Sequence, residues 1–226
     1  MGMNKKYLIF ALFVLLAVAE PALAHLPRIV ESGNVAIKSP EVSQAFYGEL
    51  MGGPAEYTIF SEKSFNLYLG LLVPVLANKD ARYSANIFRI ENGQEEFIGL
   101  LDGATASWEE MWEKFGRDYY LSGPEFERQV EPGSYKIVVS GNENQGKYVL
   151  VVGRLEKFTI LETIKAIYSI FWLKLNFFNS PIVEFFKTPF VLIGGMALVV
   201  LAILIGTVVY FIRRAIKSSK PKSIID

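Results

Sequence analysis

The stretch "EPGSYKIVVSGNENQGKYVLVVG" (residues 131–153) carries the clearest fold signal in the chain. Apolar Tyr135, Ile137 and Val139 alternate with Lys136, Val138 and Ser140, which is the period of a half-buried strand. Turn residues precede this strand at Pro132–Gly133 and follow it, before the apolar run at 146–153. The stretch therefore predicts two short strands separated by a turn.

Six further segments outside this stretch also read as strands. They are residues 44–50, 56–62, 64–74, 83–90, 95–102 and 126–131. Asn92–Gly93, between two of them, is the strongest short hairpin signal. About eight short strands with turns at this spacing predict a mainly β fold, an antiparallel β-sandwich of the jelly-roll or immunoglobulin-like kind, over residues 25–155.

Three of these segments together resemble the bacterial pre-peptidase C-terminal domain, a small β-sandwich of secreted proteins. They read "EYTIFSEKSFNLYLGLLVP" (56–74), "YSANIFRI" (83–90) and residues 131–153. Pro132–Tyr135 matches the family's "PG-x-Y" element, and Tyr148–Leu150 matches its final "Y-x-L" strand. The resemblance implies the same sandwich architecture.

The family's acidic "D-x-D/N-L" feature is missing, because residues 83–87 read "YSANI". No calcium or ligand role is carried over. The chain with its "PEVSQAFYGEL" (40–50) is also similar to an uncharacterised class of bacterial and archaeal membrane-anchored proteins, and that likeness implies no activity.

The N-terminal 24 residues read as a signal peptide. Lys5 and Lys6 precede an apolar run at 7–19, and Ala22–Ala24 has the small residues of a cleavage site. The run is too short to span a bilayer comfortably. His25 is then the expected mature N-terminus, and the alternative is an uncleaved anchor.

The C-terminal region reads as a membrane anchor. Residues 190–212 contain no charge and, as a helix, are about 35 Å long, enough to cross a hydrocarbon core of about 30 Å. The tail at 213–226 holds five basic residues and one acidic residue. Basic residues stay on the cytoplasmic side. We therefore expect a single-pass cell-membrane protein with its N-terminus outside and its C-terminus in the cytoplasm.

Residues 156–189 read as amphipathic helices next to the span. A helical run from 158 to 178 has a narrow polar stripe, and a second helix starts near Ser180–Pro181. The run either lies in the outer lipid leaflet or packs, through 158–189, against another membrane protein or a second copy. A re-entrant hairpin is the third option.

Charge and composition exclude several function classes. Residues 25–157 hold 13 Lys and Arg against 19 Asp and Glu, so this acidic body is not expected to bind nucleic acid. The chain has no Cys and one His, which leaves no common catalytic triad. We predict no enzyme activity and no cofactor.

The segment at 106–126 is the candidate binding site. Ser107 and Glu110 have the spacing of a capping box, so a short helix ending at Gly116 is predicted. Its aromatic face would hold Trp108 and Trp112, followed by Tyr119 and Tyr120, with Glu109 and Glu113 as polar contacts. The segment either binds a sugar or partner, or only plugs an open end of the sandwich.

His25 suggests a second, weaker site. A free α-amine and imidazole on one residue can chelate copper(II), which imidazole suits. No second His exists to complete such a site.

The function expected from the sequence is extracytoplasmic recognition of an envelope protein or a glycan by a membrane-anchored module. The alternatives are a structural subunit that assembles through its juxtamembrane helices and a copper-binding protein that uses His25.

Overall fold

The computed structural model describes residues 25–31, 34–78, 80–114, 116–157 and 159–218. The predicted signal peptide at 1–24 and the last residues of the tail, 219–226, lie outside this range. The described chain divides into a unit that ends at Thr188 and a helix that begins at Pro189.

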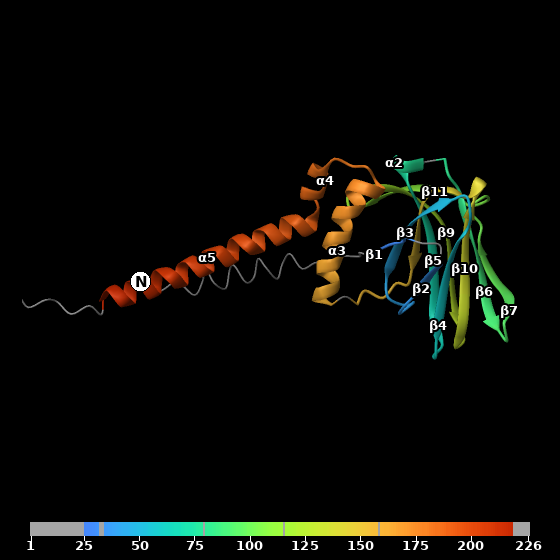
Figure 1. Cartoon of the computed structure of the whole chain (residues 1–226), viewed down its shortest axis with the longest axis horizontal. Coiled ribbons are helices and arrows are strands. Elements are labelled where there is room, and N and C mark those ends of the chain that lie inside the picture. The colour runs from blue at the N-terminus through green and yellow to red at the C-terminus, as the bar shows by residue number, and fades with distance from the viewer. Residues whose placement is uncertain (1–24, 32–33, 79, 115, 158, 219–226) are drawn as a thin grey trace, which may run out of the picture. The chain divides into compact units, whose positions relative to one another are not determined.

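The first unit is mainly β, with two stacked sheets (Figure 1). The six-stranded sheet has the order β1 (Leu26–Ile29), β3 (Gln44–Met51), β11 (Gln145–Val152), β5 (Phe65–Pro74), β9 (Asp118–Val130), β8 (Glu109–Glu113). The five-stranded sheet has the order β2 (Asn34–Ile37), β4 (Ala55–Ser61), β10 (Gly133–Gly141), β6 (Tyr83–Glu91), β7 (Gln94–Leu101). Short helical turns α2 (Val75–Asn78) and η1 (Asn142–Asn144) lie in the connections.

All eight strands predicted from the sequence are present, so the sandwich prediction is confirmed. The Asn92–Gly93 turn has positive φ at both residues, 52° and 77°, as its hairpin requires. The sheets are mixed, because β1 and β2 pair in parallel with β3 and β4. These two strands have four residues each, too few to show a period in the sequence.

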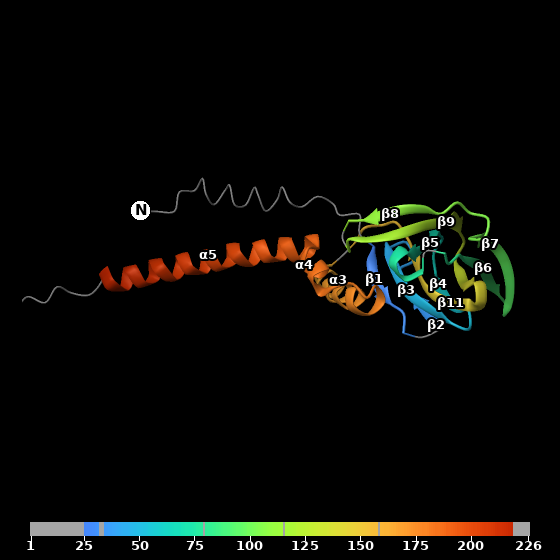
Figure 2. The same ribbon diagram turned by 90° about the horizontal axis from the view of Figure 1, so that it is seen from above.

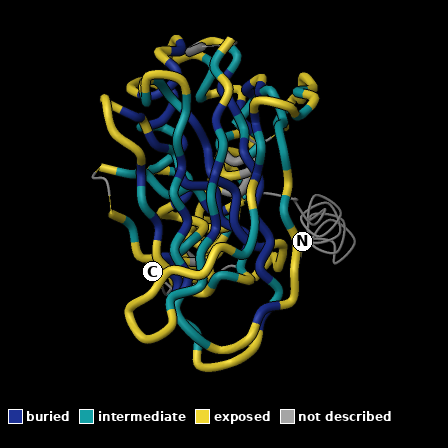
Figure 3. Tube along the Cα trace, turned by 90° about the vertical axis from the view of Figure 1, so that its right-hand side faces the viewer, coloured by how far each residue is buried: buried dark blue, intermediate teal, exposed yellow. Residues whose placement is uncertain are grey.

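The main core lies between the two sheets. Along β10, Tyr135, Ile137 and Val139 are buried and the residues between them are not, as the alternation predicts. Figure 3 shows buried segments gathered along the strands and exposed residues in the loops. Tyrosines inside this core form hydrogen bonds, such as Tyr57 Oη to Tyr148 Oη at 2.8 Å, so the buried hydroxyls are satisfied.

A second apolar cluster covers the outer face of the six-stranded sheet. Helix α3 (Ile160–Trp172) continues into a π-helical turn, η2 (Leu173–Phe177), and is followed by α4 (Ile182–Phe186). Leu173, Phe177 and Phe178 pack on Tyr120 and on Val149 of β11. The helical run predicted at 158–178 therefore packs on the protein's own sheet, an arrangement that the sequence did not reveal.

The second unit is the long helix α5 (Pro189–Ser218). Its segment Gly194–Ile216 has a mean hydropathy of 2.6 and is long enough to cross a membrane. The segment overlaps the span predicted at 190–212.

Candidate functional site

The predicted site segment is a β-hairpin. The helix expected after Ser107 is absent, and Glu109–Glu113 instead forms β8, paired antiparallel with the start of β9. In Figure 2 the two strands run side by side along one margin of the sandwich. The helix prediction was wrong because five residues fit a helical and a strand pattern equally well, and pairing with β9 decides between them.

The hairpin register divides the six predicted residues between two faces. Trp112 lies opposite Tyr119, and Glu113 lies opposite Asp118. Since successive side chains of a strand point to opposite faces, Trp112 and Tyr119 share one face, and Glu113 and Tyr120 lie on the other. Trp112 and Tyr119 are therefore separated from Tyr120, and the aromatic residues do not form one platform.

Trp108 is a packing residue. Its Nε1 donates a hydrogen bond to the Gly103 carbonyl oxygen at 2.8 Å, and its ring packs against the core between the sheets. A Cβ added at Gly123 would lie 2.4 Å from the Trp108 ring, so the ring and the β9 backbone are in close contact. The Arg82 guanidinium lies 5.4 Å from the centre of the Trp108 ring. Trp108 therefore packs against the sandwich and does not present its ring to a ligand.

Trp112 and Tyr119 remain at the surface. Their ring centres are 4.6 Å apart at an interplanar angle of 50°, and 38% and 49% of the two residues are exposed. The Arg117 guanidinium lies 5.4 Å from the centre of the Trp112 ring, within cation–π range. The pair forms a preorganised aromatic surface next to a cation.

Tyr120 is buried at 1% exposure and belongs to the outer-face cluster. Its hydroxyl lies 3.3 Å from that of Tyr47, and its ring meets Phe178 edge-on. Burial raises the pKa of Tyr120 well above its usual value, so the phenol stays neutral. Tyr120 cannot reach a ligand at the surface.

The two predicted glutamates have different surroundings. Glu113 Oε2 accepts a hydrogen bond from the Gly116 amide at 2.5 Å and so closes the hairpin turn. Glu109 is exposed, as is Glu110, which lies on the same face as Trp112. The acidic residue on the face of the aromatic pair is therefore Glu110, and Glu109 lies on the opposite face.

The sequence did not reveal the ion pair that fixes the hairpin to the helices. Lys174 Nζ donates to Asp118 Oδ1 at 2.6 Å and to the Arg117 carbonyl oxygen at 3.1 Å. The two side chains are 2% and 5% exposed. Burial raises the pKa of the Asp118 carboxyl, and the Lys174 ammonium opposes this shift. The only sequence signal was that Lys174 lies off the polar stripe of its helix.

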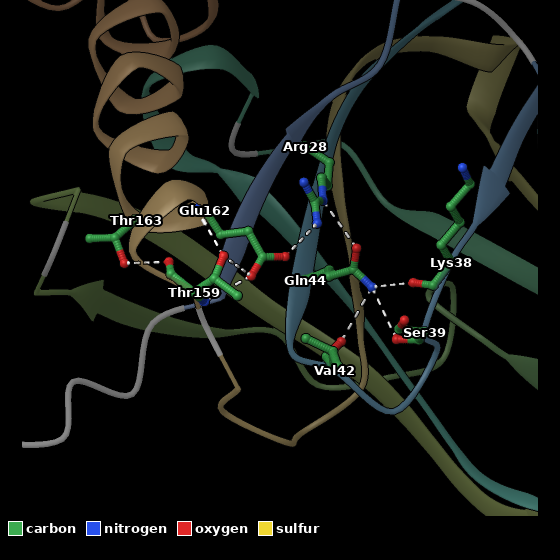
Figure 4. A network of polar contacts seen from close by, with 8 residues as sticks. All are labelled: Arg28, Lys38, Ser39, Val42, Gln44, Thr159, Glu162 and Thr163. Atoms are coloured by element: carbon green, nitrogen blue, oxygen red, sulfur yellow. Dashed lines mark hydrogen bonds and ion pairs between the residues drawn. The ribbon is translucent and has the colours of Figure 1, made fainter.

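A second network joins α3 to the edge of the sheet (Figure 4). Arg28 in β1 donates to Gln44 Oε1 at 3.0 Å and lies 3.9 Å from Glu162 Oε1. Gln44 Nε2 donates to carbonyl oxygens of residues 38, 39 and 42. Glu162 and Thr159 form a capping box at the start of α3. An open groove of about 420 Å³ lies between β1 and α3.

His25 lies just before β1, where its Nδ1 is 2.5 Å from Ser43 Oγ. Among the described residues, no group of three or more His, Asp and Glu side chains could hold a metal ion. The surroundings of His25 therefore contribute one hydroxyl and no further strong copper ligand.

The matches of this chain to known proteins are matches to solved structures. No protein-family model and no curated protein matches the chain. Among solved structures, the pre-peptidase C-terminal domain of a collagenase from Bacillus anthracis is similar at 11% identity and a TM-score of 0.32, over 57% of this chain and 95% of that one. This agrees with the resemblance in the sequence.

Two further solved structures are similar at comparable levels. A mitogen from Yersinia pseudotuberculosis has 14% identity and a TM-score of 0.33, over 53% of this chain and 92% of that one. A surface-associated copper-binding protein from Methylomicrobium album BG8 has 7% identity and a TM-score of 0.29, over 56% and 98%. Because all three TM-scores are below 0.5, the sandwich assignment rests on the strand pairing described above.

Proposed function

We propose that this chain is a single-pass, membrane-anchored binding module. Its recognition surface is the turn end of the β8–β9 hairpin, where Trp112 and Tyr119 pair. Helix α5 is the anchor, and its basic residues Arg213 and Arg214 favour a cytoplasmic C-terminus. The sandwich then lies outside the cytoplasm. The expected ligand is an envelope protein or a glycan.

The observation that carries this proposal is the exposed, stacked pair of Trp112 and Tyr119. Large aromatic side chains supply contact area at a low cost in conformational entropy, and Trp and Tyr are enriched among residues that dominate binding energy. Their faces also suit stacking on the apolar face of a sugar ring. Arg117 and Glu110 beside the pair add charges of both signs for orienting a ligand.

The hairpin is also rigid enough to present this surface. Its turn is closed by Glu113, and its first β9 residue is fixed by the buried Asp118–Lys174 ion pair. A ligand that binds there loses little free energy to ordering the loop. Binding is proposed over catalysis because the chain offers one His and no Cys for acid–base or nucleophilic chemistry.

The proposal is tested with the full chain in lipid nanodiscs, probed with an oligosaccharide array and, in intact cells, by photo-crosslinking from position 119. Trp112→Ala is expected to weaken capture about 30-fold, because the loss of a central aromatic residue costs about 2 kcal/mol. Phe60→Ala is the matched control, since Phe60 is an exposed aromatic residue on β4. Equal binding by both variants would exclude the hairpin as the recognition surface.

A further inference from the structure

Helix α3 is apolar on two opposite faces. Ala166, Ile170 and Leu173 point to the sheet and are buried. The opposite face carries Leu161, Ile164 and Tyr168, spaced three to four residues apart, and Leu175 of η2 lies two turns further on; these are 61%, 59%, 68% and 38% exposed. The sandwich satisfies one face only, so the second face is free to contact something else.

Helix α4 extends this exposed face. Phe171 of α3 meets Phe185 of α4 with ring centres 5.1 Å apart, which joins the two helices. Ile182, Val183 and Phe186 of α4 are about half exposed. We call the seven exposed apolar residues of α3, η2 and α4 the helical apolar patch; they are Leu161, Ile164, Tyr168, Leu175, Ile182, Val183 and Phe186.

We propose that the helical apolar patch lies on the lipid headgroup layer of the membrane in which α5 is anchored. Only Lys187 and Thr188 separate the end of α4 from the start of α5, so α4 has to lie at the membrane surface if α5 spans. The patch is an apolar face on a short helix pair, the pattern of interfacial helices. Tyr168 has the amphipathic ring typical of the headgroup level.

Charges of both signs surround the patch, where Glu156, Glu162 and Glu184 balance the three exposed lysines. Lys157, Lys165 and Lys187 are exposed at its margins, and Lys187 also pairs with Glu184 at 2.6 Å. Ile164 and Tyr168 also line the groove between β1 and α3, so lipid could fill that groove as well.

A lipid surface accounts for the patch better than a second copy of the chain. The patch is next to the anchor in the sequence, so the bilayer meets it without an association step. The inference rests on the proposed membrane anchoring but not on the recognition role of the hairpin. Because α3 is fixed to the sheet by Lys174, docking of the patch would also set the height and tilt of the sandwich.

The test uses the absence of cysteine from the chain, which allows single-site labelling. Ile164→Cys and Val183→Cys carry a nitroxide in the patch, Phe60→Cys is an exposed control on the sandwich, and Val199→Cys reports on α5. Each full-length variant is reconstituted in vesicles of three parts phosphatidylcholine to one part phosphatidylglycerol. Collisional accessibility to oxygen, which enters lipid, is compared with accessibility to a water-soluble nickel chelate.

The proposal predicts oxygen-favouring accessibility at 164 and 183, chelate-favouring accessibility at 60, and the deepest position at 199. Water-like values at 164 and 183 with a deep value at 199 would overturn the docking while the anchoring stands. A water-like value at 199 would remove the anchoring, and with it both proposals. Spin–spin broadening at 164 that disappears on dilution with unlabelled chain would assign the patch to a second copy instead.

Discussion

The core between the sheets and the cluster on the outer face of the six-stranded sheet are both apolar, but different parts of the sequence build them. In the core, alternating side chains of neighbouring strands meet, such as Leu67, Ile87 and Ile137. On the outer face, residues 173–178 of the helical segment meet Val149 and Val151 of β11. A buried ion pair, Lys174–Asp118, lies next to the outer cluster. The described residues of the core between the sheets are apolar side chains and tyrosines.

This difference indicates what each region contributes. The core makes the sandwich fold, whereas the outer cluster makes the helices part of the same folded unit. A sandwich with a free helical stalk would sample many orientations at the membrane. With Lys174 and Phe177 packed on the sheet, residues 173–177 belong to the folded sandwich unit.

The two largest expected effects, of similar size, lie in the core and in the outer cluster. Leu67 on β5 is fully buried, so Leu67→Ala leaves a cavity and should lower the free energy of unfolding by about 2–5 kcal/mol. Denaturant melts should show the whole sandwich unfolding earlier in one transition. If only the helical segment became less stable, the division between the two regions would be wrong.

The next effect isolates the outer cluster. Lys174→Ala leaves the buried Asp118 carboxylate without its partner and should cost about 3–5 kcal/mol. Hydrogen exchange should show α3 and η2 losing protection more than β5 and β6. The control is Lys174→Met with Asp118→Leu, which removes both charges and should recover most of the loss. A double variant no better than the single one would contradict an electrostatic cause.

A comparison of two tryptophans sharpens the distinction between packing and recognition. Trp108→Ala should lower stability by about 2 kcal/mol, because its ring fills space against Gly123 and its indole hydrogen bond is lost. Trp112→Ala should lower stability by less than about 1.5 kcal/mol, the typical range for an aromatic pair. Thermal melts measure both. The reverse order would contradict the assignment of Trp108 as the plug.

The smallest expected effect depends on pH at the start of α3. Hydrogen bonds from the Thr159 amide and hydroxyl hold the pKa of Glu162 below its usual value of 4.5. Its stabilising contribution is therefore complete above pH 4.5 and is lost as the pH falls through the lower folded value. Amide exchange at residues 162–164 should quicken there in the native chain. In Glu162→Ala, which has no carboxyl at this position, the pH step should be absent.

Part of this structure follows from sequence and part does not. Seven of the eight long strands have a period of two or a continuous apolar run, and Asn92–Gly93 fixes one hairpin, so local sequence is sufficient there; of β9 it predicts only the end, residues 126–130. The hairpin β8–β9 does not follow, because Trp108, Met111 and Trp112 also suit a helical face. Residues 109–113 form a strand because they pair with Tyr119–Ser122 of β9.

The contact between Lys174 and Asp118 could not be predicted for a different reason. The two residues are 56 positions apart, and no local pattern links a lysine on an apolar helix to an aspartate at the start of a strand. The separation of Tyr119 from Tyr120 in the candidate site also depends on contacts between distant parts of the sequence. The alternation that buries Tyr120 and exposes Tyr119 depends on the register of β9 against β8 and β5.

Hydrogen exchange of the full chain in lipid nanodiscs tests most directly whether the helical segment belongs to the sandwich. The amides of residues 170–177 should exchange as slowly as those of β11, through the same global opening. If they exchange at the rate of an isolated helix while β11 stays protected, the helices are a separate stalk.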